Sequence, residues 1–307
     1  MRTREPIGII VVVFSSAVLT FAQGGPPTGI QNNGAIQLLR SETKVAVIPG
    51  TPPVDATTDN VAGSFVKSDY TNYTPPTLPP STTIGPCTVT SIPLPLTQQP
   101  PTGIVTTFLD GGPALNINGP NGLMQVPQSM PAPMVLTYFM QVGGGVPLPP
   151  LPFPIPGLPG LMPPYLDPGT YTVDNGGGGA DVGPFMATLN VPSPGFLWTN
   201  ADANLTIVRS AGVDLQWSGG DPNAMVEIQG VSSSPTVAGG FTCIVPNNGE
   251  FVVTSDVLSL LPASPATATP GNSLSVSNTT FANFSASGLD LGILTYESGF
   301  TRTVVYQ

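Results

Sequence analysis

The chain has 307 residues and a formal net charge of −10, and only 8% of its residues are charged. Soluble domains usually carry about 25% charged residues, so Ser, Thr, Asn, Gly and Pro must form much of the surface, which favours strands over helices. The few Lys and Arg residues are scattered, which excludes nucleic acid and disfavours anionic membranes as partners. The sequence contains no histidine, which excludes His-based catalytic triads and His-ligated zinc.

The first 22 residues have the pattern of a secretory signal peptide. Arg2 and Arg4 precede an apolar stretch over Ile7–Leu19, and small residues lie around Ala22. A transmembrane helix would need a longer apolar run. We therefore expect cleavage near Ala22 and a secreted mature protein, extracellular or at the cell surface, without a membrane span.

Residues 23–82 are polar and rich in proline, and we expect either a leader or the first strands of the fold there. The only strand signals are weak, over Lys44–Ile48 and Ser64–Val66. Composition alone leaves both interpretations open.

Residues 83–192 are expected to form a first β-sandwich, because short alternating runs are separated by turn residues. The expected strands are Cys87–Thr90, Ile104–Leu109, Ala114–Ile117, Met134–Val142, Thr170–Val173 and Phe185–Val191. The last two form a hairpin around a glycine-rich loop, and a break at Pro192–Gly195 follows.

A proline-rich insertion at residues 147–164 interrupts this first domain, with nine prolines in eighteen positions. This composition favours polyproline II and removes donors that a sheet interior needs. Two interpretations remain: a stiff loop folded back on the sandwich, or an exposed apolar segment that binds a partner.

Residues 193–307 are expected to form a second sandwich with short strands and frequent turns. The expected strands are Asn204–Val208, Val213–Trp217, Met225–Ile228, Phe241–Val245, Glu250–Thr254, Ser273–Val276, Leu289–Leu294 and Phe300–Tyr306. One helical turn is expected over Ser255–Leu261, with Ser255 as its N-cap and Pro262 after it. The predicted fold is all-β, with two tandem antiparallel Ig-like sandwiches.

Two segments carry a resemblance to known families. Leu166–Val173 (L-D-P-G-T-Y-T-V) is similar to the tyrosine-corner motif of fibronectin type III and related bacterial surface sandwiches, although Tyr171 directly follows Thr170. Val213–Ile228, with its W-S-G-G-D-P turn, resembles secreted bacterial Ig-like proteins. The resemblance implies sandwich modules and bacterial export, and it brings no catalytic or binding residues with it.

Three groups of residues are candidates for chemistry. Asp174, Asn175 and Asp181 in the glycine-rich loop supply oxygen ligands that calcium prefers, although their spacing matches no EF-hand. Trp198, next to the domain junction, either packs at the hinge or forms an exposed platform that contacts a ligand, whereas Trp217 lies on the apolar face of its strand and is expected in the core. Cys87 and Cys243 either form a disulfide across a long loop or remain separate, with Cys243 packed as a small apolar residue.

No constellation in the sequence indicates an enzyme or a bound cofactor. A glycan hydrolase needs two carboxylates within about 5–10 Å of each other, and the candidates are Asp174, Asp181, Asp214, Asp221, Glu227, Glu250 and Asp290. We predict an exported, non-catalytic protein with a structural, adhesive or surface-interaction role toward an extracellular protein or glycan. The alternatives are a carbohydrate-binding module and a carboxylate-based glycan hydrolase.

Overall fold

A computed structural model describes residues 29–45, 53–74, 80–94, 103–146, 162–264 and 271–307. The described chain is built of strands, with a four-residue α-helix, α1 (Ser255–Leu258), and a short 3-10 helix, η1 (Ala201–Asn204). The all-β prediction is confirmed. The predicted signal peptide, and residues 147–161 of the proline-rich insertion, lie outside the described residues.

One large mixed sheet runs through both halves of the chain. Its order is β10-β9-β6-β7-β8-β2-β1-β18-β17-β14-β15-β4-β3, with β5 paired beside β2. The strands are β1 (Ile30–Val45), β2 (Val54–Asp69), β3 (Ser81–Ile84), β4 (Cys87–Pro93), β5 (Val105–Phe108), β6 (Ala114–Gly119), β7 (Gly122–Ala132), β8 (Val135–Gly145), β9 (Gly169–Asp174), β10 (Met186–Val191), β14 (Met225–Ser233), β15 (Val237–Pro246), β17 (Ser273–Phe284) and β18 (Leu291–Thr303).

The expected division into two tandem Ig-like sandwiches is not confirmed. The N-terminal strand β1 pairs in parallel with the C-terminal strand β18, from Asn33 opposite Leu291 to Thr43 opposite Thr301. On its other side β1 pairs antiparallel with β2 along its whole length. Of the two interpretations left open for this region, residues 30–45 and 54–69 therefore fit the first strands of the fold, and they lie at the centre of the sheet.

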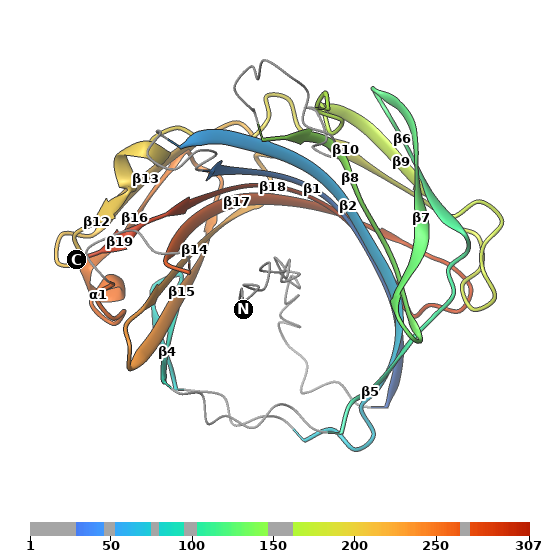
Figure 1. Ribbon diagram of the computed structural model, residues 1–307, viewed down its shortest axis with the longest axis horizontal. Helices are drawn as coiled ribbons and strands as arrows, with labels where there is room; N and C mark the ends of the chain where they lie inside the picture. Colours follow the sequence, from blue (N-terminus) through green and yellow to red (C-terminus); the bar gives the residue numbers. More distant parts are fainter. Residues whose placement is uncertain (1–28, 46–52, 75–79, 95–102, 147–161, 265–270) are drawn as a thin grey trace, which may run out of the picture.

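The sheet curves into an arch, and further layers lie on its outer side (Figure 1). At one end these layers are β11 (Leu197–Trp198), β13 (Val213–Ser218) and β16 (Glu250–Val253), with the pair β12 (Thr206–Ile207) and β19 (Val305–Tyr306). At the other end the sheet folds back on itself, so that β10 packs against β17 and β18. Apolar side chains of the arch strands point outward into these layers.

Two hydrophobic cores result. The first core includes Leu115, Tyr171 and Leu189, and there the rings of Phe185 and Phe284 stack with centroids 4.4 Å apart. The second core surrounds Trp198 and Trp217. Strands β17 and β18 supply residues to both cores, among them Val276 to the second and Leu294 to the first. The cores therefore share two long strands.

An ion-pair cluster extends the outward face of β1 and β2 toward η1. The Arg302 guanidinium, with only 4% of its side chain exposed, lies 2.9 Å from a carboxylate oxygen of Glu42 and 3.3 Å from oxygens of Asp55 and Asp202. Lys44 Nζ lies 2.8 Å from Asp202 as well. These contacts connect the C-terminal strand β18 with β1, β2 and η1.

Candidate functional site

The calcium candidates in the glycine-rich loop are engaged in hydrogen bonds from the protein. Asn175 is buried, and its side chain donates to the carbonyls of Gly111 and Gly183 and accepts from the N–H of Phe185. Asp174 accepts from Asn116 at 2.7 Å, and Asp181 accepts from the N–H of Asp110 at 2.8 Å. Across the described residues no three carboxylate, Cys or His side chains gather in a metal-binding group.

This loop packs tightly against a neighbouring turn. A Cβ at Gly179 would lie 2.3 Å from the backbone nitrogen of Gly112, and Gly178 has a φ of +86°. Glycine is required here by a close backbone approach and a left-handed conformation. The loop therefore has a structural reason for its composition that does not involve a ligand.

Both tryptophans lie in the second core. Trp198 is 2% exposed, and its Nε1 donates to Asn200 at 2.9 Å. Trp217 is 4% exposed and donates to Asn247 at 2.8 Å. Because the Trp198 ring is covered, the structure offers no exposed ring face there for a ligand, and of the two interpretations the packing one fits.

Cys87 and Cys243 form a disulfide between neighbouring strands. They are register partners on β4 and β15, with Cα atoms 4.0 Å apart. Both residues belong to the second core, so the bond joins a strand from the first half of the chain to the core of the second half.

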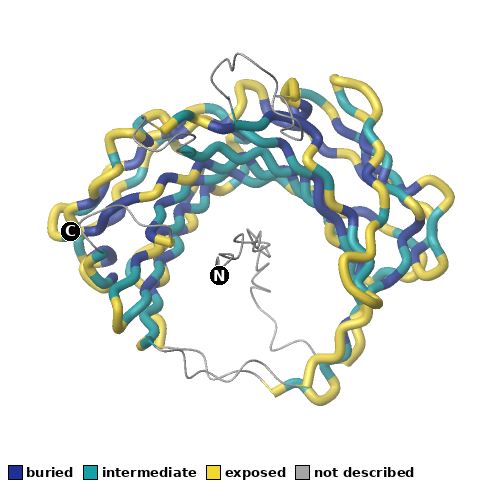
Figure 2. Tube along the Cα trace, viewed as in Figure 1, coloured by how far each residue is buried: buried dark blue, intermediate teal, exposed yellow. Residues whose placement is uncertain are grey.

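The inner, concave face of the arch carries many polar side chains on the described strands. Along β17 and β18, residues buried on the outer side alternate with half-buried residues that point inward (Figure 2). No described strand or helix lies inside the arch (Figure 1). The described strands and helices therefore leave this face uncovered.

A row of hydroxyl and amide side chains, here called the hydroxyl row, crosses the concave face. Its residues are register partners on consecutive strands from β18 to β3, namely Thr301, Ser275, Gln229, Thr242, Thr88 and Thr83. Neighbouring strands are about 4.8 Å apart, so the row presents hydrogen-bonding groups at a regular spacing.

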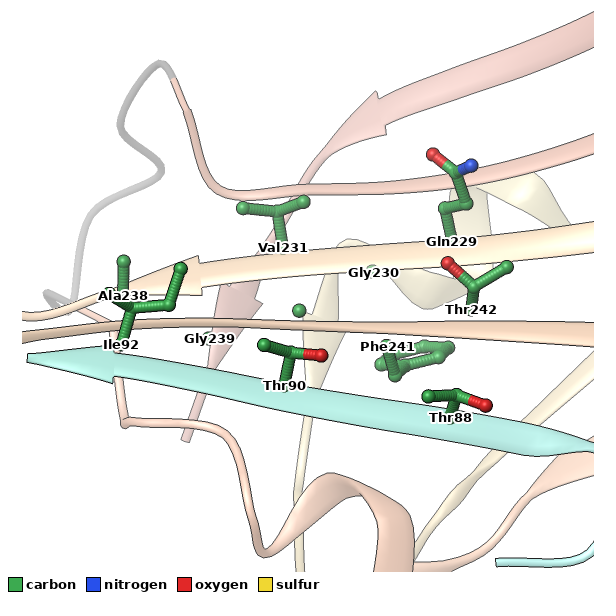
Figure 3. A pocket seen from close by; sticks show the side chains of 11 residues that line it. Thr88, Thr90, Ile92, Gln229, Gly230, Val231, Ala238, Gly239, Phe241 and Thr242 are labelled. Atoms are coloured by element: carbon green, nitrogen blue, oxygen red, sulfur yellow. The ribbon is translucent and has the colours of Figure 1, made fainter. Parts of the chain in front are cut away.

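Two shallow depressions lie along this part of the face. The first has a volume of about 450 Å³ and forms where Gly240, which has no side chain, is the register partner of both Thr90 and Val231. Figure 3 shows Thr90 and Val231 among the side chains that line it. The second has a volume of about 320 Å³ and lies across β15, β14 and β17. Both are lined by residues of β14 and β15, so they are neighbours on this face, the first toward β4 and the second toward β17.

The second depression, here called the Phe281 groove, combines apolar and acidic side chains. Phe281, Met225 and Ile244 are 67%, 46% and 47% exposed. Glu227, Asp221 and the other polar lining residues lie among them. The complete lining is Asp221, Asn223, Ala224, Met225, Glu227, Ile244, Thr279, Thr280 and Phe281.

A second carboxylate, Glu297, lies next to this groove. It pairs in register with Thr279, and it accepts a hydrogen bond of 2.8 Å from Gln37, while Glu227 accepts one from Gln229. Burial raises the pKa of Glu297 and the charge of Glu227 raises it further, whereas hydrogen bonds from Ser277 and Gln37 oppose the rise. Two acids thus interact on this face.

No basic residue that the structure describes balances these acids from the concave face. Arg40, Lys44 and Arg302 are held in ion pairs on the outward face, and Arg209 donates to the carbonyl of Leu261 at 2.6 Å. Lys67 is exposed on β2 and lies on the same side of that strand as Phe65, which packs in the outward core. The face is therefore polar and negatively charged.

Of the carboxylates considered from sequence, only Asp221 and Glu227 line this groove. Sequence reasoning missed Glu297 and Phe281, because the expected strands ended at Val276 and Leu294. The available signal was the alternation of Ser273, Ser275 and Ser277, which continues along β17 to Phe281 and places its ring on the same face. Glu297 lies on this face through its pairing with Thr279.

Comparison of the chain with protein-family models gives no match, and comparison with curated proteins gives no significant match. Among the described helices none is long and apolar enough to cross a membrane.

Proposed function

We propose that this chain is an exported, non-catalytic surface-interaction protein that contacts its partner through the concave face of its large sheet. The observation that supports this proposal is the polar, uncovered inner side of the arch, set opposite two cores that occupy the outer side. Contact sites need a surface that folding leaves free, and here packing takes up only one side of the central strands.

The shape of this face suits an extended partner more than a small molecule. The hydroxyl row spans consecutive strands, and Thr88, Gln229 and Thr242 of the row also line the first shallow depression. Small-molecule sites, by contrast, are usually clefts or cavities that bury most of the ligand surface. An extended polymer or a protein surface fits such an open, hydrogen-bonding track better.

The proposal is tested by placing a bulky charged side chain on the face. Thr88 is exposed in the hydroxyl row, and Thr188 is exposed on β10 at the outer side. We expect Thr88→Arg to abolish saturable binding on an array of extracellular proteins and glycans, and Thr188→Arg to retain it. Equal binding by both variants would move the contact surface away from the concave face.

Carbohydrate recognition is the second candidate function, favoured by one specific observation. The hydroxyl row and the exposed Phe281 ring lie on the same face, and sugars present both hydroxyl groups and apolar C–H faces. Release of shortened products on the same array would instead favour a hydrolase that uses Glu227 and Glu297, two acids that interact on the concave face.

A further inference from the structure

We infer that the Phe281 groove is a subsite for one pyranose ring of an uncharged glycan. This inference rests on the proposed contact role of the concave face and assigns a ligand class to one part of it. The groove has a volume of about 320 Å³, at the lower end of the roughly 300–1,000 Å³ usual for ligand pockets. It therefore suits a single ring of a longer chain.

The first step is the aromatic platform. Phe281 lies near the end of β17 with 67% of its surface exposed, which is unusual for a large apolar side chain within a strand. Apolar side chains exposed together mark contact sites more often than isolated ones, and Met225 and Ile244 are exposed in the same groove. The apolar C–H face of a sugar can stack on this ring.

The second step is the set of hydrogen-bonding groups beside the ring. Glu227 and Asp221 present carboxylate acceptors, and Asn223 and Thr279 present groups that both donate and accept. Sugar hydroxyls can donate to the carboxylates, which form stronger hydrogen bonds than neutral acceptors. Apolar platform and polar rim together match a pyranose ring better than a purely hydrocarbon ligand.

The third step is charge, which selects among glycans. Glu227, Asp221 and the neighbouring Glu297 carry negative charge, and no described basic residue lies on the concave face to pair with an anionic ligand. Like charges placed against each other oppose association. Uronic-acid and sialylated glycans are therefore excluded. Glu297 and Glu227 already accept hydrogen bonds from Gln37 and Gln229. Neither carboxylate therefore requires a cationic sugar as its hydrogen-bond donor.

The test is calorimetric titration of the purified protein with neutral glucan and N-acetylglucosamine oligosaccharides, and with uronic-acid oligosaccharides of matched length. We expect saturable binding to a neutral oligosaccharide and none to the acidic set. Phe281→Ala should weaken that binding about tenfold, equivalent to one strong aromatic contact. Phe139→Ala is the matched control, because Phe139 is 49% exposed on β8, outside the groove.

A second pair of variants tests the acidic rim. Glu227→Gln keeps the shape of the side chain and should weaken binding of the neutral oligosaccharide while reducing discrimination against the acidic one. Glu250→Gln, at an exposed position on β16, should change neither. Circular dichroism of each variant should match the parent, since Phe281 and Glu250 are exposed and Glu227 is replaced by an isosteric residue.

The outcomes separate the inference from the proposed function. Neutral-glycan binding that survives Phe281→Ala but not Thr88→Arg overturns the groove assignment and keeps the concave face. If the concave face binds a protein and no glycan, the groove assignment is likewise overturned and the concave face is kept as the contact surface. Preference for a free-amine glycan overturns the neutral assignment. A dimer that dissociates on Phe281→Ala shows that a second copy of this chain occupies the groove and overturns the inference too.

Discussion

Asp59 is a fully buried carboxylate that joins two central strands to the chain segment before β9. Its oxygens accept from Arg40 Nε and Nη2, both at 2.7 Å, and from the N–H groups of Tyr165 and Leu166. Burial lowers the pKa of Arg40, but the hydrogen bond and charge of Asp59 outweigh that effect and raise it. A buried acid with four such donors is fully satisfied.

Replacing this carboxylate should be costly. We expect Asp59→Ala to lower the free energy of unfolding by about 3–5 kcal/mol, because Arg40 and two backbone N–H groups would lose their partner. Urea denaturation of both proteins measures the difference. Asp167→Ala is the control, since Asp167 lies 3.6 Å from Arg40 with 48% of its side chain exposed, and it should cost under about 1 kcal/mol. A similar cost for both variants would contradict this account.

Glu297 should make stability depend on pH with a defined sign. Burial and the charge of Glu227 raise its pKa above the ordinary value of 4.5, so the folded state holds the proton more tightly than the unfolded state. The stability that protonation contributes is complete below the unfolded pKa and is lost as pH rises through the folded pKa. Desolvation of the Glu297 carboxylate, together with its repulsion by Glu227, is therefore expected to weaken the fold toward neutral pH.

The variant Glu297→Gln removes this titration. We expect its free energy of unfolding, relative to the parent, to increase as the pH is raised from acidic to neutral, because only the parent acquires the buried charge. Denaturant midpoints over that pH range measure the effect. Glu250→Gln, at an exposed position, should show a flat difference. A flat difference for Glu297→Gln as well would show that neither burial nor the charge of Glu227 raises the pKa of Glu297 in the folded protein.

At the scale of elements, β4 depends on the disulfide because it lies close to one end of the sheet. Only the four-residue β3 lies beyond it, and on its other side it pairs with β15. The disulfide Cys87–Cys243 closes a loop with a sequence separation of 156 residues. In the chain-entropy model a loop of this length restricts the unfolded state strongly.

The double variant Cys87→Ala/Cys243→Ala should lose roughly 2–5 kcal/mol of unfolding free energy. Amide hydrogen exchange should accelerate in β3 and β4 and change little in β6 and β7, which lie at the other end of the sheet. The parent protein under reducing conditions is the control for the substitutions themselves, and it should reproduce both effects. Unchanged denaturant midpoints would show that strand pairing alone holds β4.

Elements with one apolar and one polar face were predictable from sequence. The hairpin of β9 and β10 is confirmed with Leu189 opposite Tyr171, and Tyr171 Oη donates to the carbonyl of Tyr165 at 2.6 Å. The helical turn exists, but it ends at Leu258 and its N-cap is Thr254, not Ser255. Regular alternation is the signal that a half-buried strand leaves in a sequence.

Strands β1 and β2 were poorly predicted for a physical reason. Their outward positions hold apolar residues such as Ile36 and Leu38 at one end, and the charged Arg40, Glu42 and Lys44 at the other. Those charges pair with residues distant in sequence, so the alternation of apolar residues stops although the strand continues. Pairing partners cannot be read from the sequence of a single strand. The concave face could therefore be identified only once the order of the strands in the sheet was known.

At the scale of the whole molecule, the shared sheet connects the two cores mechanically. Strands β17 and β18 carry residues of both cores, and β1 pairs with β18 along most of its length. If the first core opens, the outward faces of β17 and β18 lose packing, and the register that positions Val276 and Phe300 in the second core is no longer supported. Separate sandwiches joined by a linker would not have this dependence.

We therefore expect unfolding in denaturant to be a single cooperative transition. Both tryptophans lie in the second core, so their fluorescence reports that core, whereas far-UV circular dichroism reports all strands. The two probes should give the same midpoint. Leu115→Ala in the first core should cost about 2–5 kcal/mol and lower the tryptophan midpoint as much as the dichroism midpoint, as Leu215→Ala in the second core should. Tryptophan fluorescence that keeps its parental midpoint in Leu115→Ala would mean that the cores unfold independently despite their common strands.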